Sequence, residues 1–428
     1  MTKFLFVSWD GLIADIAWQV VKEGHEVKLW IQNEEERGIG DGFVPKTDDW
    51  RREVDWADVV VFDDVLGMGK LAEELRARGK PVVGGSTYTD RLEDDRAFGQ
   101  QELKTVGVSI IAHENFTSFD AAVAYVQENP NRYVIKPSGE AQNIKRLLFV
   151  GEEDDGRDVL QVLQDYKRAW SDKVKEFQLQ RRILGVEVAV GAFFNGKEFV
   201  TPVCVNFEHK KLFPGDIGPP TGEMGTSMFW SEPNRLFNAT LKKMEAKLAE
   251  ARYAGYIDIN CIVNNNGIYP LEFTSRFGYP AISIQQEGLL TPMGELLQGL
   301  ATGGITRLRA RSGFQIGVRI VVPPFPYHDP ETLENTSKDS VILFKTPSRE
   351  GYHIEDVRTA EGEWLVTGTS GVVLIVCGSG PTMRQAQRQA YNRVRNVMIP
   401  HMYYRDDIGE RWYEDSDRLH AWGYLREA

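Results

Sequence analysis

Short apolar runs alternate with amphipathic segments over the first 90 residues. The runs at residues 4–7 and 27–31 are predicted strands, and an amphipathic helix that ends near Gly24 lies between them. The segments ADVVVFDD, GKLAEELRARG and KPVVGG then repeat the order strand, helix, strand. This alternation predicts a parallel, doubly wound sheet, so the N-terminal region is expected to be α/β and Rossmann-like.

Beyond residue 90 the apolar positions recur mainly with period two, which is typical of antiparallel strands. Two segments, 132–151 and 176–211, carry such strands, and the second contains an Asn-Gly turn. The other elements expected are a short strand near 108–112, a long helix from about Leu236 to Ala254, a hairpin turning at Asn266 and Gly267, and a helix from about Met383 to Met398.

Composition narrows the class of protein. A length of 428 residues suggests about three domains at roughly 150 residues each. The net charge of -12 argues against a nucleic acid or an anionic membrane as partner. No apolar run reaches the roughly 18 residues of a membrane span. The three cysteines form no CxxC pair, which excludes an obvious zinc or disulfide framework and favours a reducing cytoplasm.

Two segments have the composition of a nucleotide site. Lys136 ends the apolar strand YVIK, and the small-residue loop that follows ends in Lys145. Lysines at both ends of such a loop can neutralise phosphates while backbone amides approach closely. A strand is predicted through Gln180 to Leu184, and Glu187 follows it. The backbone of such a strand can contact an adenine, and a carboxylate placed after it can hold ribose hydroxyls. An ordinary solvated strand would have the same pattern.

The predicted hairpin carries two rows of polar side chains. Asp258 and Asn260 share one face of the first strand, while Glu272, Thr274 and Arg276 share one face of the second. If the two strands pair, the rows become neighbours. Oxygen ligands of this kind, completed by phosphate, are what Mg²⁺ prefers. A solvent-facing polar row is the alternative.

A stretch rich in Gly and Pro, LFPGDIGPPTGEMGT (212–226), is predicted to be a long shaped loop. With LEDDRAFGQQ, YVIKPSG, LEFTSRFGYP and a C-terminal GVVLIVCGSGPTMRQAQRQAYNRV, it resembles the ATP-grasp ligases, and among them the glycinamide ribonucleotide synthetases. The resemblance covers about residues 90–412. It implies a Rossmann-like domain at 1–90, an α+β ATP-grasp domain at 91–310 with a mobile lid at about 115–180, and a small α+β domain at 311–428.

The resemblance also implies roles for individual residues. ATP would be bound by Lys136, Lys145, Gln180, Ile183 and Glu187, with Lys145 on the lid. Mg²⁺ or Mn²⁺ would be bound by Glu272, Asp258 and Thr274, and the substrates would be bordered by Asp216, Thr221, Gly222 and Glu223. Arg276 would be the catalytic residue that faces the transferring phosphoryl group.

Several positions depart from the family pattern. Thr274 stands where the family has a metal-binding Asn, and Asp258 where the synthetases have Tyr. Glu223 adds an acid to the TGGMG motif, and Tyr279 replaces the Asp of Asp-Pro-Glu after RFG. The family's N-terminal Gly-Gly-Arg-Glu-His segment is SWDGLIADIAW here. Aspartates thus replace an arginine-bearing phosphate site, which argues by charge against a phosphorylated sugar amine.

The activity implied is ADP-forming ligation of a small-molecule carboxylate and an amine through an acyl phosphate, by a cytoplasmic monomer or homodimer. Two alternatives stay open: an ATP-grasp kinase that stops at phosphoryl transfer, and a non-catalytic ATP-binding protein. A nicotinamide enzyme is disfavoured, because VSWDGLIAD lacks the G-x-G-x-x-G that lets backbone approach a pyrophosphate.

Overall fold

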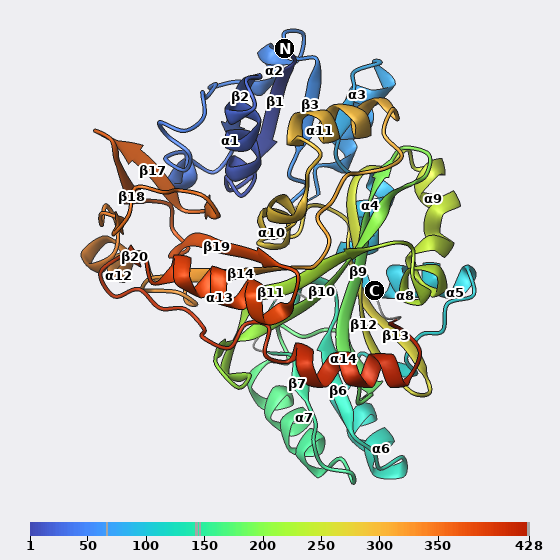
Figure 1. Ribbon diagram of the computed structural model, residues 1–428. Coiled ribbons are helices and arrows are strands. Elements are labelled where there is room, and N and C mark those ends of the chain that lie inside the picture. Colours follow the sequence, from blue (N-terminus) through green and yellow to red (C-terminus); the bar gives the residue numbers. More distant parts are fainter. Residues whose placement is uncertain (66, 142–143, 145–146, 426–428) are drawn as a thin grey trace.

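The N-terminal region is a parallel sheet between helices, shown in blue in Figure 1. The structure is a computed structural model that describes residues 1–428 except 66, 142–143, 145–146 and 426–428. The described strands run in the order β2-β1-β3-β4, and β1 pairs in parallel with β2 and β3. The elements are β1 (Lys3–Ser8), α1 (Ala14–Lys22), β2 (Glu26–Ile31), η1 (Glu34–Glu36), α2 (Trp50–Glu53), β3 (Val59–Phe62), α3 (Gly69–Ala77) and β4 (Val82–Val83). The predicted α/β alternation is therefore confirmed.

A large sheet forms the middle of the molecule. Its described strands run in the order β13-β12-β9-β10-β11-β14-β19-β16, with antiparallel neighbours. They are β9 (Val186–Asn195), β10 (Phe199–Phe213), β11 (Ile217–Ser231), β12 (Ala254–Asn264), β13 (Gly267–Thr274), β14 (Phe314–Val321), β16 (Tyr352–Ile354) and β19 (Val372–Gly380). Because β11 pairs with β14, segments on both sides of residue 310 share one sheet and one core.

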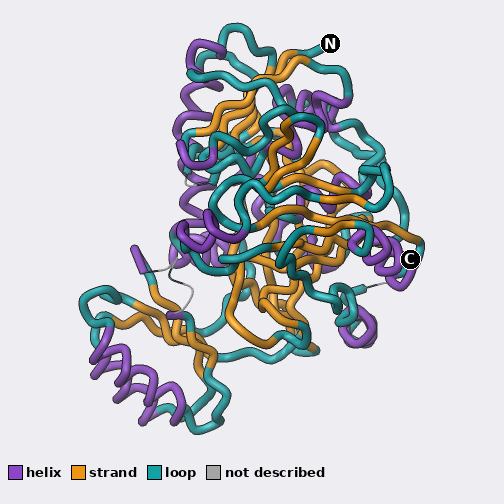
Figure 2. Tube along the Cα trace, turned by 90° about the vertical axis from the view of Figure 1, so that its left-hand side faces the viewer, coloured by secondary structure: helices purple, strands orange, loops and turns teal. Residues whose placement is uncertain are grey.

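A smaller sheet with two helices projects from this body, as Figure 2 shows at its lower left. It contains β5 (His113–Phe116), α6 (Phe119–Glu128), β6 (Tyr133–Pro137), η2 (Gly139–Ala141), β7 (Phe149–Val150), α7 (Arg157–Ala169) and β8 (Phe177–Arg181). A separate apolar cluster, which includes the stacked rings of Phe119 and Phe177, fills its interior. This unit occupies the stretch predicted as the lid.

Helices and short strands complete the chain. They are α4 (Thr87–Asp94), α5 (Arg96–Thr105), α8 (Arg235–Ala239), η4 (Leu241–Met244), α9 (Glu245–Glu250), α10 (Ala281–Gly288), α11 (Met293–Thr302), α12 (Pro330–Thr336), β15 (Leu343–Phe344), β17 (Val357–Ala360), β18 (Glu363–Val366), α13 (Met383–Val394), β20 (Val397–Met398) and α14 (Trp412–Ala421). Within the described residues, no helix combines the length and apolar character needed to cross a membrane.

Several predicted elements were wrong in extent, among them the helix at 383–398, which ends at Val394. The long helix at 236–254 is broken at Thr240, which has non-helical backbone angles and whose hydroxyl donates to the carbonyl of Leu236. The strand near 108–112 lies at His113–Phe116 instead. The stretch 212–226 is largely not a loop, because β10 and β11 pair almost to their ends around a short turn. Register shifts along the pair accommodate the Gly and Pro residues that suggested a loop.

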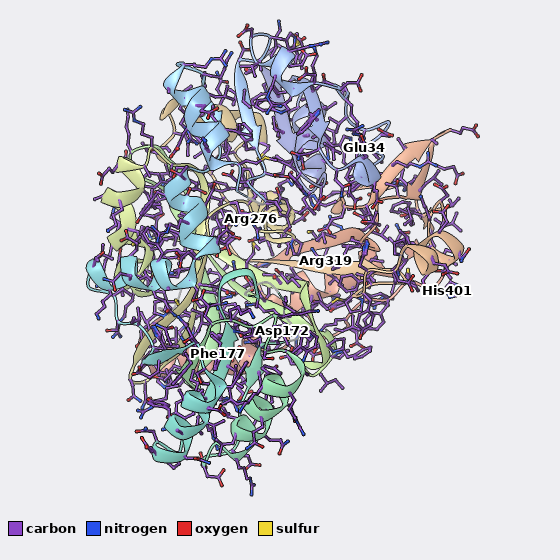
Figure 3. All side chains as sticks on the ribbon, turned by 180° about the vertical axis from the view of Figure 1, so that it is seen from behind. Glu34, Asp172, Phe177, Arg276, Arg319 and His401 are labelled. Carbon is purple, nitrogen blue, oxygen red and sulfur yellow. The ribbon has the colours of Figure 1, made fainter. Side chains whose placement is uncertain are left out.

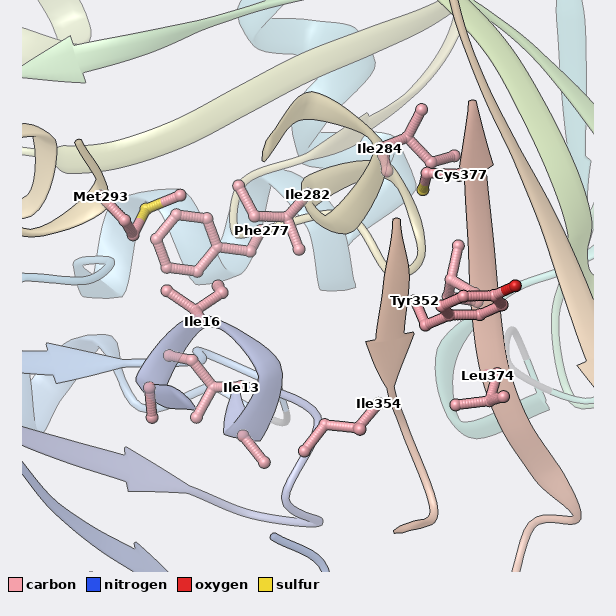
Figure 4. Packing of buried hydrophobic residues seen from close by; sticks show 14 of the residues in the cluster. Ile13, Ile16, Phe277, Ile282, Ile284, Met293, Tyr352, Ile354, Leu374 and Cys377 are labelled. Carbon is pink, nitrogen blue, oxygen red and sulfur yellow. The ribbon is translucent and has the colours of Figure 1, made fainter. Parts of the chain in front are cut away.

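The N-terminal region packs directly on the segment that carries the RFG motif. Figure 4 shows Ile13 and Ile16, from the start of α1, beside Phe277 and Met293. All four side chains are almost fully buried in the largest apolar cluster. This packing places the end of β13 and the start of α10 against the carboxyl ends of the parallel strands.

Candidate nucleotide and substrate site

The hairpin β12–β13 brings the two polar rows together as predicted. Asp258 is the direct cross-strand neighbour of Thr274, and Asn260 that of Glu272. The Oδ1 atom of Asn260 is buried and has no hydrogen-bond partner among the described residues. Burial and the nearby Glu208 raise the pKa of Asp258 well above its usual value. A divalent cation would relieve both features, since it takes oxygen ligands and favours an ionised carboxylate.

The donor set therefore fits a hard divalent cation. No group of three or more His, Cys, Asp or Glu side chains within the described part of the chain is arranged to hold a metal ion. Magnesium bound together with a nucleotide needs only one or two protein carboxylates, because phosphates and water complete its shell. Asp258 and Glu272 satisfy this requirement, with the hydroxyl of Thr274 beside them.

Two cations face this hairpin from other parts of the chain. Lys136 lies near the end of β6 and is buried, and burial with the adjacent Arg96 lowers its pKa to about 8. The charge of Glu272 acts against this lowering and raises the pKa of both Lys136 and Arg96. Arg96 begins α5 and donates to the carbonyl of Pro137 at 3.0 Å. Positive groups of this kind are what the oxygens of a triphosphate require. Lys145, the other predicted phosphate ligand, lies outside the described residues.

The predicted adenine and ribose residues lie on β8, on β9 and in the connection between these strands. Gln180 is buried on β8, and its Nε2 has no partner among the described residues. The strand was predicted to continue to Leu184, but it ends at Arg181. Ile183 therefore lies in the connection to β9. Its backbone groups are thus outside the sheet ladder. Glu187, on β9, accepts from Lys210 at 2.8 Å. Burial alone would raise the pKa of Glu187, but the charge and hydrogen bond of Lys210 outweigh burial and lower that pKa.

The predicted substrate residues separate into two places. Asp216 lies in the turn between β10 and β11, where its carboxylate accepts from the buried Arg405 at 2.9 Å. Thr221 donates to the carbonyl of Lys210 at 2.8 Å, while Gly222 is exposed. Glu223 is buried and accepts from Thr226, and burial together with Glu208 raises its pKa. Thr221 and Glu223 therefore lie near Lys210 and Glu208, beside the β12–β13 hairpin. Asp216 is instead held by the C-terminal region.

The prediction that Arg276 continues the polar face of β13 was wrong, because that strand ends at Thr274. The hydroxyl of Ser275 donates to the carbonyl of Thr89, and the chain then enters the loop before α10. The guanidinium of Arg276 pairs with Glu93 at 3.0 Å and interacts electrostatically with Asp258. The side chain thus still reaches the region of the β12–β13 hairpin from the loop.

A second arginine lies in the middle of the molecule. Figure 3 shows Arg319 and Arg276 there, between the N-terminal sheet and the lid. Arg319 is buried on β14, donates to the carbonyl of Glu223 at 2.7 Å and pairs with Glu355 at 3.1 Å. Its Nε has no partner among the described residues. Arg319 thus joins Glu223, on the neighbouring strand β11, to Glu355, which follows β16.

The sequence reasoning missed several of these charged residues. They are Arg96, Glu93, Glu208, Lys210, Arg319 and Glu355. A signal existed for two of them, since Glu208 and Lys210 alternate along NFEHKK and so share a strand face. The others reach the site from separate elements, and no spacing along the chain relates them to the hairpin.

Comparison with known proteins places this geometry in a family. Residues 94–282 match the family model "Phosphoribosylglycinamide synthetase, ATP-grasp (A) domain", and residues 330–411 match the C domain of the same synthetase. The phosphoribosylamine–glycine ligase of Halalkalibacterium halodurans is 25% identical over 355 residues, which cover 80% of this chain and 79% of the relative. That of Streptococcus suis is 25% identical over 358 residues, with 82% of each chain covered.

Solved structures agree on the fold. The phosphoribosylamine–glycine ligase of Thermotoga maritima superposes with a TM-score of 0.71 at 21% identity, covering 95% of this chain and 100% of that one. The biotin carboxylase domain of a Hydrogenobacter thermophilus 2-oxoglutarate carboxylase, solved with MgADP, has a TM-score of 0.64 at 14% identity and covers 100% of both chains. The α+β fold expected for the nucleotide-binding region is confirmed. The chain belongs to the ATP-grasp ligases that resemble phosphoribosylglycinamide synthetase.

Proposed function

We propose that this protein joins a small-molecule carboxylate to an amine, with ATP as the activating substrate and ADP and phosphate as products. The observation that carries the proposal is the meeting of Lys136 and Arg96 with Glu272 at one end of the β12–β13 hairpin. Positive groups for phosphates and carboxylates for a divalent cation are the two parts that ATP chemistry requires.

The phosphates of ATP would lie between the lid and the central sheet. Lys136 and Arg96 would bind phosphate oxygens, and Lys145 would add a third cation from the lid. Gln180 and the backbone near Ile183 would contact the adenine, and Glu187 the ribose. Glu187 is held by Lys210, so ribose binding would add donors to a carboxylate that is already ionised.

Asp258, Glu272 and Thr274 would hold Mg²⁺ or Mn²⁺. When bound, the cation would offset the negative charge that develops as the phosphoryl group is transferred. Asn260 offers a further oxygen, because its Oδ1 is unpartnered among the described residues. The chain thus supplies oxygen ligands on one strand pair for a cation, which would in turn bind the phosphates.

The reaction would proceed in two steps. An oxygen of the substrate carboxylate attacks the γ-phosphorus, the bond to the β-γ bridging oxygen breaks, and ADP leaves. The neutral amine then attacks the acyl carbon, phosphate leaves with the bonding pair, and the amine nitrogen loses a proton. Arg276 would neutralise charge on the transferring phosphoryl group and then on the tetrahedral oxyanion. No protein nucleophile is required.

The curated relatives are named for phosphoribosylamine and glycine. For this chain we propose the broader carboxylate and amine class as partners. The remaining proposals are a monomer or homodimer and a cytoplasmic location, the latter supported by three buried, unpaired cysteines.

Glu272→Gln tests the assignment directly. We expect phosphate release from ATP, measured with Mg²⁺ and a panel of carboxylates and amines, to fall at least about 100-fold, since a metal-binding charge is lost. Glu363→Gln, an exposed position on β18, is the matched control and should retain wild-type rates. Equal turnover by Glu272→Gln and wild type would show that this carboxylate holds no catalytic metal.

Hydroxylamine distinguishes the open alternatives. A ligase forms an acyl phosphate, which hydroxylamine converts to a hydroxamate. A kinase acting on a hydroxyl consumes ATP without hydroxamate, and a non-catalytic binder does not consume ATP.

A further inference from the structure

The carboxyl ends of the parallel strands face the RFGYP segment of the active site. In open α/β sheets this edge is where ligands bind. Ser8 ends β1, and its hydroxyl donates to the carboxylate of Asp63, the residue that follows β3. Asp63 also accepts from the backbone N–H of Trp9 at 3.1 Å and interacts electrostatically with Arg276. This edge therefore belongs to the same site as Arg276.

The neighbouring Asp64 has an unused acceptor. Its side chain is buried, with 8% exposed, and its Oδ2 accepts from the backbone N–H of Gly85. Its Oδ1 has no partner among the described residues. The hydroxyl of Tyr279 is likewise buried and unpartnered there. Burial raises the pKa of Tyr279, and Asp63 and Asp64 add to this increase, so the ring lies within electrostatic range of both acids.

The charge at this edge is negative. Burial, Asp90 and Asp63 all raise the pKa of Asp64, which means that ionised Asp64 lacks sufficient compensation. Two arginines act on these acids, Arg76 on Asp64 and Arg276 on Asp63, but both also have other partners. Arg276 pairs with Glu93, and Arg76 donates to the carbonyls of Gly84 and Gly85. A phosphate would add negative charge to this edge, whereas an ammonium group would supply both the missing charge and hydrogen-bond donors.

We propose that this edge binds an amine substrate that carries a second, protonated amino group, with Asp64 Oδ1 and the Tyr279 hydroxyl as acceptors for that ammonium group while the attacking amine stays neutral, and that it rejects phosphorylated amines. The proposal rests on the proposed function only in naming the bound cation as the amine substrate. It departs from phosphoribosylamine, the phosphate-bearing amine in the relatives' name.

The test compares two probes that differ in one group. 1,4-Diaminobutane and 4-aminobutyl phosphate share an aminobutyl chain. At its other end the first carries an ammonium group and the second a phosphate. Calorimetry on the full-length protein without ATP should show binding of the diamine at least about 10-fold tighter. Asp64→Asn should weaken diamine binding about 10-fold or more, as expected for loss of a charged hydrogen-bond partner.

The variant and its control share a backbone conformation. Asp64 has φ 55°, which asparagine also tolerates, so the substitution removes charge without forcing the chain to move. Asp339, with φ 61°, is exposed and pairs with Arg358, and Asp339→Asn should bind the diamine as wild type does.

Each result decides the inference. Equal or tighter binding of 4-aminobutyl phosphate would overturn it, and so would unchanged diamine binding by Asp64→Asn. The calorimetry needs no turnover, so failure here is distinct from failure of ligation. Hydroxamate formation without diamine binding would support the ligase and refute the cation site. Diamine binding without hydroxamate formation would support the cation site and refute the ligase.

Discussion

At the scale of single residues, burial gives Lys136 a property that its sequence position does not. Its ammonium is removed from water and lies beside Arg96, and both lower its pKa to about 8. Glu272 offsets this only in part. A lysine in such a setting is positively charged at neutral pH but loses its charge in mildly alkaline solution.

The affinity for ATP should therefore fall above pH 8. Deprotonation of Lys136 in the free protein removes a phosphate ligand, so the Kd for ATP should rise by up to about tenfold per pH unit between pH 8 and 9.5. Lys210, with a pKa raised well above its usual value, does not titrate in this range. Calorimetry across this range measures the effect.

Lys136→Arg provides the comparison, because arginine stays charged throughout. We expect its ATP affinity to be nearly constant from pH 7 to 9.5. A wild-type Kd that is equally constant would show that Lys136 does not contribute to binding through its charge.

At the scale of elements, strand pairing determines how the site is assembled. The register of β12 against β13 sets Asp258 beside Thr274 and Asn260 beside Glu272. A slip of one residue would turn one row to the opposite face of the sheet. The pair β10–β11 similarly extends to a turn at Asp216, which is joined to the C-terminal region through Arg405.

Arg405 should be a large contributor to stability. Its side chain is fully buried, pairs with Asp407 and Asp216 at 2.7 and 2.9 Å, and donates to the carbonyl of Lys211. Arg405→Met should lower the free energy of unfolding by about 3 kcal/mol, because carboxylates are left without their partner. Urea unfolding measures this change.

Arg307→Met is the matched control. Arg307 pairs with Glu232 on the surface, where both side chains are 64% exposed, so its loss should cost less than about 1 kcal/mol. Similar losses in the two variants would mean that these pairs are weak despite the burial of Arg405.

At the scale of the whole molecule, a buried ion pair joins the first helix to the C-terminal region. The carboxylate of Asp15, on α1, contacts Nδ1 of His353 on β16 at 2.8 Å and also accepts from Gln286 on α10. Despite burial, Asp15 raises the pKa of His353, and His353 lowers the pKa of Asp15. Three regions far apart in sequence thus meet at one carboxylate.

Asp15→Asn should destabilise the protein by about 3 kcal/mol at pH 6, because His353 loses its charge partner. The histidine's share of this stability is present below its unfolded pKa of about 6.5 and is lost as pH rises through its raised folded pKa. The share of Asp15 is present above about 3.9 and is lost as pH falls through its lowered folded pKa.

The difference between wild type and Asp15→Asn should therefore be larger at pH 6 than at strongly alkaline pH. Urea unfolding at several pH values tests this, with the exposed Asp172→Asn as control. A difference independent of pH would indicate that the pair is not ionised.

Much of the architecture was predictable because it follows from local periodicity. The strand and helix alternation before residue 90 and the β12–β13 hairpin were both confirmed. The break at Thr240 and the pairing through 212–226 were not predicted, since helix and loop propensities are weak where tertiary packing competes.

By itself, the sequence determined the fold class and the family and supplied the residues proposed to bind ATP, because motifs and period-two patterns are local properties of the chain. Only the tertiary structure decided which charges meet. Arg96, Lys136 and Glu272 converge from three elements, and Asp64 comes within electrostatic range of Tyr279, more than 200 positions away along the chain. Electrostatic interactions depend on distance in space and on burial, and neither quantity can be read from spacing along the chain.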